Sequence, residues 1–262
     1  MSVLEKRKLG NTGIEVSCLG LGTVKFGRNQ EVKYPTTFSL PTDQEVQTLL
    51  ARAAELGINL LDTAPAYGSS EQRLGRLLKN REQWVICSKV GEEFLAGTSV
   101  YKFDAAHVRS SIERSLRDLH TDYLDIVLIH SDGRDKTILD STDCVETLQR
   151  LQQEGLVRSI GMSSKTVDGG IAALERMDVV MATYNKEATA DATVIDFAAQ
   201  HGKGILIKKA LNSGHVSTAA DGAGKALEFA LSKNGVSSVI VGTINASHLQ
   251  SNVEAAIAAN ST

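Results

Sequence analysis

Residues 60–71 read LLDTAPAYGSSE. An apolar run that is typical of a buried strand ends on Asp62, and Tyr67 follows five residues later. Two later apolar runs also reach a residue that can carry a proton: WVICSKV reaches Lys89, and YLDIVLIH ends on His130. Ionisable groups at the ends of buried strands cost free energy unless another group pairs with them or uses them. We therefore expect these strand ends to lie together in one site.

Strand-like and helix-like segments alternate along the chain. The apolar runs are nearly continuous, which indicates strands buried on both faces and therefore a parallel sheet. Eight such units predict a closed (β/α)8 TIM barrel. An open doubly wound sheet is the alternative, but the G-x-G-x-x-G motif typical of its first turn is absent. The expected strands cover residues 16–23, 59–64, 84–90, 123–130, 157–163, 179–185, 204–209 and 237–242, and two of the clearest expected helices cover 104–119 and 143–153.

The barrel is expected to occupy residues 1–262 as a single domain, because no linker-like or low-complexity stretch divides the chain. Before the barrel, the segment KRKLGNTGIEV predicts a short N-terminal β-hairpin that turns at residues 11–13. Gly57, Gly155 and Gly202 stand where helices should end, since glycine readily adopts the left-handed conformation that follows a helix.

The composition indicates an ordinary globular protein with no nucleic-acid or membrane partner. Hydrophobic residues make up 42%, charged residues make up 23% and the net charge is −3, so no large field of one sign is expected. No apolar run approaches the roughly 18 residues that cross a bilayer, and the N-terminus lacks a signal-peptide pattern. Three widely spaced cysteines favour free thiols and a cytoplasmic location. No histidine spacing predicts a metal site, and no oligomeric state is indicated.

The strand-end residues together form a proton-transfer set. A free phenol has a pKa of about 10 and is a poor acid at neutral pH, but a nearby ammonium stabilises the phenolate and lowers that pKa. Lys89 can supply this charge to Tyr67, while Asp62 holds the lysine charged and oriented. His130 can donate to a carbonyl oxygen, which Tyr67 then protonates as the carbonyl carbon receives a hydride. Each residue alone has an ordinary structural role, but the four together predict a catalytic site.

The chain resembles the aldo-keto reductase family over nearly all of its length. The resemblance implies a TIM barrel and hydride transfer from a nicotinamide cofactor to an aldehyde or ketone. It also implies that Tyr67 is the general acid, tuned by Lys89 and Asp62, and that the carbonyl is oriented by His130. The motifs that carry the resemblance include GINLLDTAPAYGSSE at 57–71, SKV at 88–90, DYLDIVLIH at 122–130, GLVRSIGMSS at 155–164 and SSVIVGTINASHLQSN at 237–252.

The resemblance further implies that the cofactor lies extended across the barrel mouth. Ser163 and Ser164 align with the pair that holds the nicotinamide carboxamide. Met181 stands where the family often has Gln for the same group. Lys208 stands where the family commonly has an aromatic residue that stacks on the nicotinamide ring, and a lysine cannot supply that π surface. The residues expected near the nicotinamide ribose are Thr23, Val24 and Asp62.

The phosphates and adenine are expected at the end of the chain. Gly242 and Thr243 lead into a helix start, whose free N–H groups suit phosphate. His248 stands where many members have Arg, the usual reader of a 2′-phosphate. NADP is therefore the cofactor that the resemblance implies, and NAD is not excluded. Leu211 and Ser213 fall where the family wraps the pyrophosphate, and Asn252 matches an adenine contact.

The leading interpretation is an NAD(P)-dependent oxidoreductase that acts on a small aldehyde, ketone or sugar, or on the corresponding alcohol. One alternative is a cofactor-sensing or regulatory protein on the same fold with little turnover, which the departures at Met181 and Lys208 favour. Another is a Schiff-base lyase that uses Lys89, against which the neighbouring proton-transfer residues argue. Phe26 and Phe94, in variable loops, are the expected apolar walls of the substrate pocket.

Overall fold

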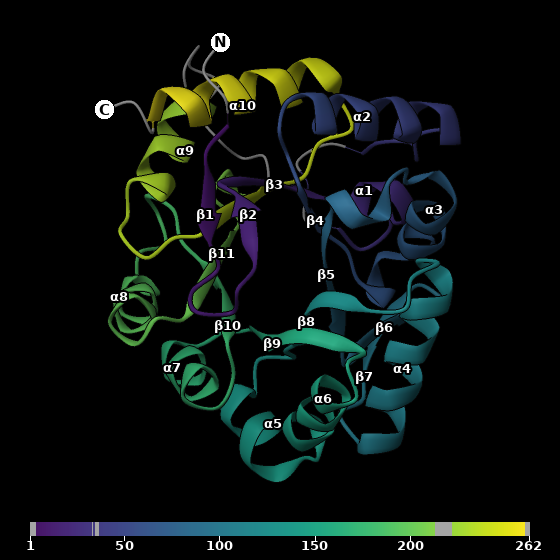
Figure 1. Ribbon diagram of the computed structural model, residues 1–262, viewed down its shortest axis with the longest axis vertical. Helices are drawn as coiled ribbons and strands as arrows, with labels where there is room; N and C mark the ends of the chain where they lie inside the picture. Colours follow the sequence, from purple (N-terminus) through teal and green to yellow (C-terminus); the bar gives the residue numbers. More distant parts are fainter. Residues whose placement is uncertain (1–3, 33, 35–36, 213–221, 260–262) are drawn as a thin grey trace.

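A closed barrel of parallel strands forms the centre of the computed structural model, which describes residues 4–32, 34, 37–212 and 222–259. Neighbouring strands follow the order β10-β11-β12-β3-β4-β5-β8-β9, with the helices around the outside (Figure 1). The predicted (β/α)8 TIM barrel is confirmed. The barrel strands are β3 (Leu19–Gly22), β4 (Leu60–Asp62), β5 (Val85–Val90), β8 (Leu124–His130), β9 (Val157–Ser163), β10 (Val179–Thr183), β11 (Gly204–Lys208) and β12 (Ser238–Val241).

Local sequence signals set the ends of the outer helices. Helix α2 (Asp43–Glu55) begins with a capping box, in which Thr42 and Glu45 satisfy each other's backbone N–H groups. Gly57 follows the end of this helix with a φ of +86°, as expected for a helix stop. Within the described residues, every helix is too short or too polar to span a lipid bilayer. The other helices are α1 (Val24–Gly27), α3 (Ser70–Leu77), α4 (Ala105–Asp118), α5 (Asp135–Ser141), α6 (Cys144–Gln153), α7 (Val167–Arg176), α8 (Ala192–His201), α9 (Gly222–Leu231) and α10 (Ala246–Ala259).

The N-terminal hairpin closes one end of the barrel. Strands β1 (Lys6–Lys8) and β2 (Glu15–Ser17) pair antiparallel, which confirms the predicted hairpin. Its apolar side chains Leu9, Ile14 and Val16 join the cluster that fills the barrel interior. Because this end is plugged, the opposite end, where the parallel strands have their carboxyl termini, is the one open to ligands.

A second hairpin lies in a stretch that we expected to be an irregular loop. Strands β6 (Glu92–Leu95) and β7 (Thr98–Tyr101) pair antiparallel, with Glu92 opposite Tyr101. Each strand has only four residues, so period-two patterning is too short to predict it. The hairpin follows β5 directly and brings its first residues to the open end of the barrel.

Candidate active site

A buried ion pair stands at the carboxyl ends of two neighbouring strands, β4 and β5. Lys89 Nζ lies 2.5 Å from Asp62 Oδ1 and donates a second hydrogen bond of 2.9 Å to the Thr63 carbonyl oxygen. The two side chains are only 1% and 6% exposed. Burial by itself would lower the pKa of Lys89, but the Asp62 carboxylate and its other neighbours outweigh burial and raise that pKa. Lys89 is therefore a permanent cation in the floor of the site.

Tyr67 lies against this ion pair. It ends a short 3₁₀ helix, η1 (Pro65–Tyr67), that follows β4, and its hydroxyl donates to Asp62 Oδ2 over 3.3 Å. The Lys89 ammonium is 4.7 Å from the centre of its ring. Lys89 acts to lower the pKa of Tyr67, as expected, but burial and the Asp62 charge are stronger, so the net effect raises it. The expected net lowering is therefore not found, because the sequence could not weigh burial against the two charges.

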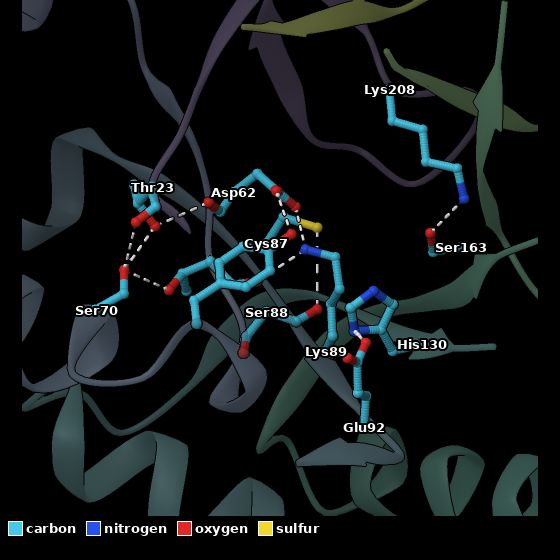
Figure 2. Close-up of polar contacts among 12 residues, drawn as sticks. Thr23, Asp62, Ser70, Cys87, Ser88, Lys89, Glu92, His130, Ser163 and Lys208 are labelled. Atoms are coloured by element: carbon cyan, nitrogen blue, oxygen red, sulfur yellow. Dashed lines mark hydrogen bonds and ion pairs between the residues drawn. The ribbon is translucent and has the colours of Figure 1, made fainter. Parts of the chain in front are cut away.

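His130, at the end of β8, completes the predicted set. Its ring lies 6.4 Å from the Tyr67 ring, centre to centre, and nearly perpendicular to it. His130 Nδ1 lies 2.9 Å from Glu92 Oε2, on the β6–β7 hairpin. Burial, together with the charges of Lys89 and Lys208, lowers the pKa of His130, although Glu92 acts to raise it. Figure 2 shows Asp62, Lys89 and His130 grouped at the strand ends, with Glu92 against the histidine.

Glu92 and Arg28 are site residues that the sequence analysis missed. Burial raises the pKa of Glu92, but the contacts with His130, Ser99 and Arg28 outweigh it and lower that pKa to about 2. The Arg28 guanidinium lies 3.7 Å from Glu92 Oε1 and 3.6 Å from the Phe94 ring centre. No sequence pattern marks either residue, and the strands of the β6–β7 hairpin, which carries Glu92, have only four residues each.

A cavity of about 1070 Å³ opens above these residues. Its wall includes the whole predicted catalytic set and most of the predicted cofactor positions, so residues from widely separated strands do meet there. The predicted residues on this wall are Val24, Asp62, Tyr67, Lys89, His130, Ser163, Ser164, Met181, Lys208, Leu211, Gly242, Thr243, His248 and Asn252.

The cavity wall does not include every residue predicted to reach it. Phe26 is fully buried in the core between the barrel and its helices, because α1 turns its only buried side chain inward. Phe94 covers Arg28 instead of the cavity. Thr23 lies behind the wall, where its hydroxyl donates to the Asp62 carbonyl oxygen over 2.9 Å. Ser213 lies outside the described residues.

Lys208, Ser163 and Ser164 lie together on another part of the cavity wall. Lys208 Nζ donates to Ser163 Oγ over 2.8 Å and to the Ser164 carbonyl oxygen over 2.7 Å. Burial, and then the adjacent Lys209, lower the pKa of Lys208 to about 7. The buried Ser164 hydroxyl has no hydrogen-bond partner among the described residues. Met181 is 2% exposed and contributes to the floor.

These residues fit a nicotinamide dinucleotide. The volume is at the upper end of the range of about 300–1000 Å³ that is typical of small-molecule sites. An unsatisfied buried hydroxyl at Ser164 suits an amide, and Lys25 and Lys209 on the wall suit phosphate. No group of three His, Cys, Asp or Glu side chains in the described part of the chain could hold a metal ion.

Comparison with known proteins identifies the family. A sequence profile of the Aldo/keto reductase family matches residues 18–226. The chain belongs to the aldo-keto reductase family. Members of this family are oxidoreductases that act on carbonyl compounds and sugars and generally use nicotinamide cofactors.

Relatives of this aldo-keto reductase include a solved structure and characterised enzymes. A Pseudomonas aeruginosa protein assigned to the same family is 50% identical, with a TM-score of 0.91, over 99% of this chain and 97% of that one. L-galactose dehydrogenase of Arabidopsis thaliana is 29% identical over 97% of this chain and 89% of its own length. NADH-specific methylglyoxal reductase of Escherichia coli is 30% identical over 70% of this chain and 59% of its own length.

Proposed function

We propose that this aldo-keto reductase transfers a hydride between NADP and a carbonyl/alcohol pair, with Tyr67 as the general acid or base. The observation that carries the proposal is the meeting of Tyr67 with Asp62, Lys89 and His130 on the wall of one large cavity. The nicotinamide, when bound, supplies or accepts the hydride. NAD is the alternative cofactor, since the related Escherichia coli reductase is NADH-specific and His248 stands where an arginine would read a 2′-phosphate.

The phenol of Tyr67 would give its proton to the substrate oxygen as negative charge develops there. Tyr67 holds its proton at neutral pH, as a donor must, but its raised pKa makes it a weak acid, so the transfer depends on the negative charge that hydride transfer builds on the substrate oxygen. Lys89 would stabilise the phenolate that remains, because its ammonium lies beside the ring and cannot easily lose its proton. Asp62 keeps that ammonium in place.

His130 would orient the substrate oxygen. Its Nδ1 faces the Glu92 carboxylate, which leaves Nε2 as the ring nitrogen available to a substrate. Nε2 can donate to a carbonyl only when it carries a proton. Glu92 favours the doubly protonated ring and burial opposes it, so Glu92 has a positioning and electrostatic role: it keeps Nδ1 engaged and offsets part of the effect of burial.

The substrate class we propose is a small aldehyde, ketone or sugar. Near His130 the cavity wall is polar, with Arg28, Glu92, Ser99 and Tyr101 among its residues. Such a wall suits hydroxyl groups on the substrate, because each buried polar group requires a hydrogen-bond partner. Two relatives have names that fit this class, one for L-galactose and one for methylglyoxal.

The test compares two tyrosines on the same cavity wall. Tyr67→Phe should lower kcat on an aldehyde and aldose panel by about 10²–10⁴-fold, as expected for loss of a general acid, while cofactor affinity measured by calorimetry is retained. Tyr101→Phe, the matched control, should lower kcat by less than about tenfold. Cofactor binding without turnover of any substrate would instead support a sensing role. If neither NADPH nor NADH binds, the proposed function is wrong.

A further inference from the structure

Lys208 differs from Lys89 in the groups that accept its hydrogen bonds. Lys89 is held by a carboxylate, whereas Lys208 donates to two neutral oxygens, Ser163 Oγ and the Ser164 carbonyl. Among the residues that the structure describes, no carboxylate forms an ion pair with Lys208. The protein thus places an uncompensated ammonium on the cavity wall at the end of β11.

The charges around Lys208 do not neutralise it. The carboxylate of Asp191 raises the pKa of Lys208 from a distance. One oxygen of Asp191 already accepts a hydrogen bond of 2.8 Å from the Thr183 backbone N–H. Three neighbouring cations, Lys209, Lys89 and Lys165, lower the pKa of Lys208. Lys208 in turn lowers the pKa of His130.

The nicotinamide ring, in the function proposed above, has to lie close to Tyr67. The hydride-donating carbon must approach to about 3–3.5 Å of the carbonyl carbon, and the carbonyl oxygen must be within hydrogen-bond reach of the Tyr67 hydroxyl. Asp62 and Lys89 lie on one side of the site and Lys208 lies across from them, while His130 lies beside Ser163 on the neighbouring strand (Figure 2). A ring that meets both conditions would share the cavity with Lys208, which lines the same wall as Tyr67.

We propose that Lys208 selects the redox state of the cofactor, so that the site binds the reduced nicotinamide dinucleotide more tightly than the oxidised one. The reduced ring is neutral and the oxidised ring carries one positive charge, so the ammonium repels only the oxidised form. At an effective dielectric constant of about 20, the repulsion between two unit charges separated by about 6–12 Å corresponds to a preference of about ten- to a hundredfold. This inference rests on the proposed function and extends it: at equal concentrations of the two forms, most sites would hold the reduced cofactor, which is the form that carbonyl reduction consumes.

The preference depends on the protonation of Lys208. Burial and Lys209 lower the pKa of Lys208 to about 7, so the ammonium is largely lost between about pH 6 and 8.5. The ratio of the two dissociation constants, oxidised over reduced, should therefore fall as pH rises through this range. An arginine at position 208 would stay charged and should keep the ratio high at both pH values.

The experiment is calorimetric titration with NADPH, NADP⁺, NADH and NAD⁺ at about pH 6 and pH 8.5. The ratio for the unmodified protein should be at least about tenfold at pH 6; Lys208→Met should reduce it toward one at both pH values, and Lys208→Arg should keep it at pH 8.5. Lys136→Met removes an exposed lysine that is not on the cavity wall and should leave the ratio unchanged.

Two outcomes would overturn the inference, and they are distinguishable. If nucleotides bind but Lys208→Met and the unmodified protein have the same ratio, Lys208 is not the selector and the proposed function stands. If no nucleotide binds the unmodified protein, the proposed function fails and this inference fails with it. Should Lys208→Met not fold by circular dichroism, the Lys208→Arg comparison at pH 8.5 decides: a ratio equal to that of the unmodified protein overturns the inference.

Discussion

Replacing Asp62 with Asn tests how much the buried ion pair with Lys89 contributes to the stability of the protein. The substitution removes one charge with almost no change in volume. Lys89 then keeps its ammonium 1% exposed, with the Thr63 carbonyl and a neutral amide as its acceptors. Its pKa should fall, because Asp62 is the neighbour that most strongly raises it against the effect of burial.

The magnitude follows from the geometry of the pair. At the 2.5 Å separation of Nζ and Oδ1, an effective dielectric constant of about 20 gives an attraction of roughly 7 kcal/mol. The penalty for burying Asp62 disappears with its charge and offsets part of this loss. Breaking a buried pair on one side typically costs about 3–5 kcal/mol, and we expect Asp62→Asn to lower the free energy of unfolding by that amount. The loss is a large share of the total, which for a domain is about 5–15 kcal/mol.

Urea unfolding followed by circular dichroism measures this loss. The double variant Asp62→Asn/Lys89→Met should be more stable than Asp62→Asn alone, because it removes the stranded ammonium as well. Glu154→Gln is the control: it breaks an exposed ion pair with Arg109 and should leave the unfolding midpoint within experimental error. The reasoning fails if Asp62→Asn unfolds at the same urea concentration as the unmodified protein, or if the double variant loses the sum of the two single losses.

Two further predictions concern buried carboxylates near the site. Glu71 is 3% exposed, and burial raises its pKa to about 7, against hydrogen bonds from Ser88 and Ser115 that lower it. Since the folded protein then holds a proton that the unfolded chain has lost, stability should fall by about 3 kcal/mol between about pH 4.5 and 7. Glu71→Gln should abolish this fall in urea titrations; parallel curves for the two proteins would contradict it. Glu92→Gln should lower kcat and move the alkaline decline of kcat to lower pH, because His130 loses the charge that favours its protonation; an unchanged pH profile would show that Glu92 does not act through His130.

The positions at strand ends could be predicted from the sequence because a parallel barrel brings all its carboxyl ends to one face. Asp62, Lys89 and His130 are each the last or nearly the last residue of a strand, so strand order alone brings them together. Glu92 lies on a hairpin whose strands have only four residues each, and no periodic pattern predicted where it would fold. The sequence therefore predicted the site residues that the barrel strands carry, but not the one on the hairpin.

Side-chain direction and the balance of opposing charges could not be predicted in the same way. Phe26 and Phe94 were expected on the cavity wall as apolar residues in variable loops, yet one packs into the core and the other covers Arg28. Burial and Asp62 raise the pKa of Tyr67 while Lys89 lowers it, so the sign of the net shift depends on which contribution is larger. Composition and spacing carry no information on such sums, because each contribution depends on distances of a few ångströms. The outcome is a phenol that holds its proton at neutral pH beside a lysine that holds its charge, so the geometry of the pair, and not a lowered pKa, is what fits Tyr67 to protonate a substrate oxygen.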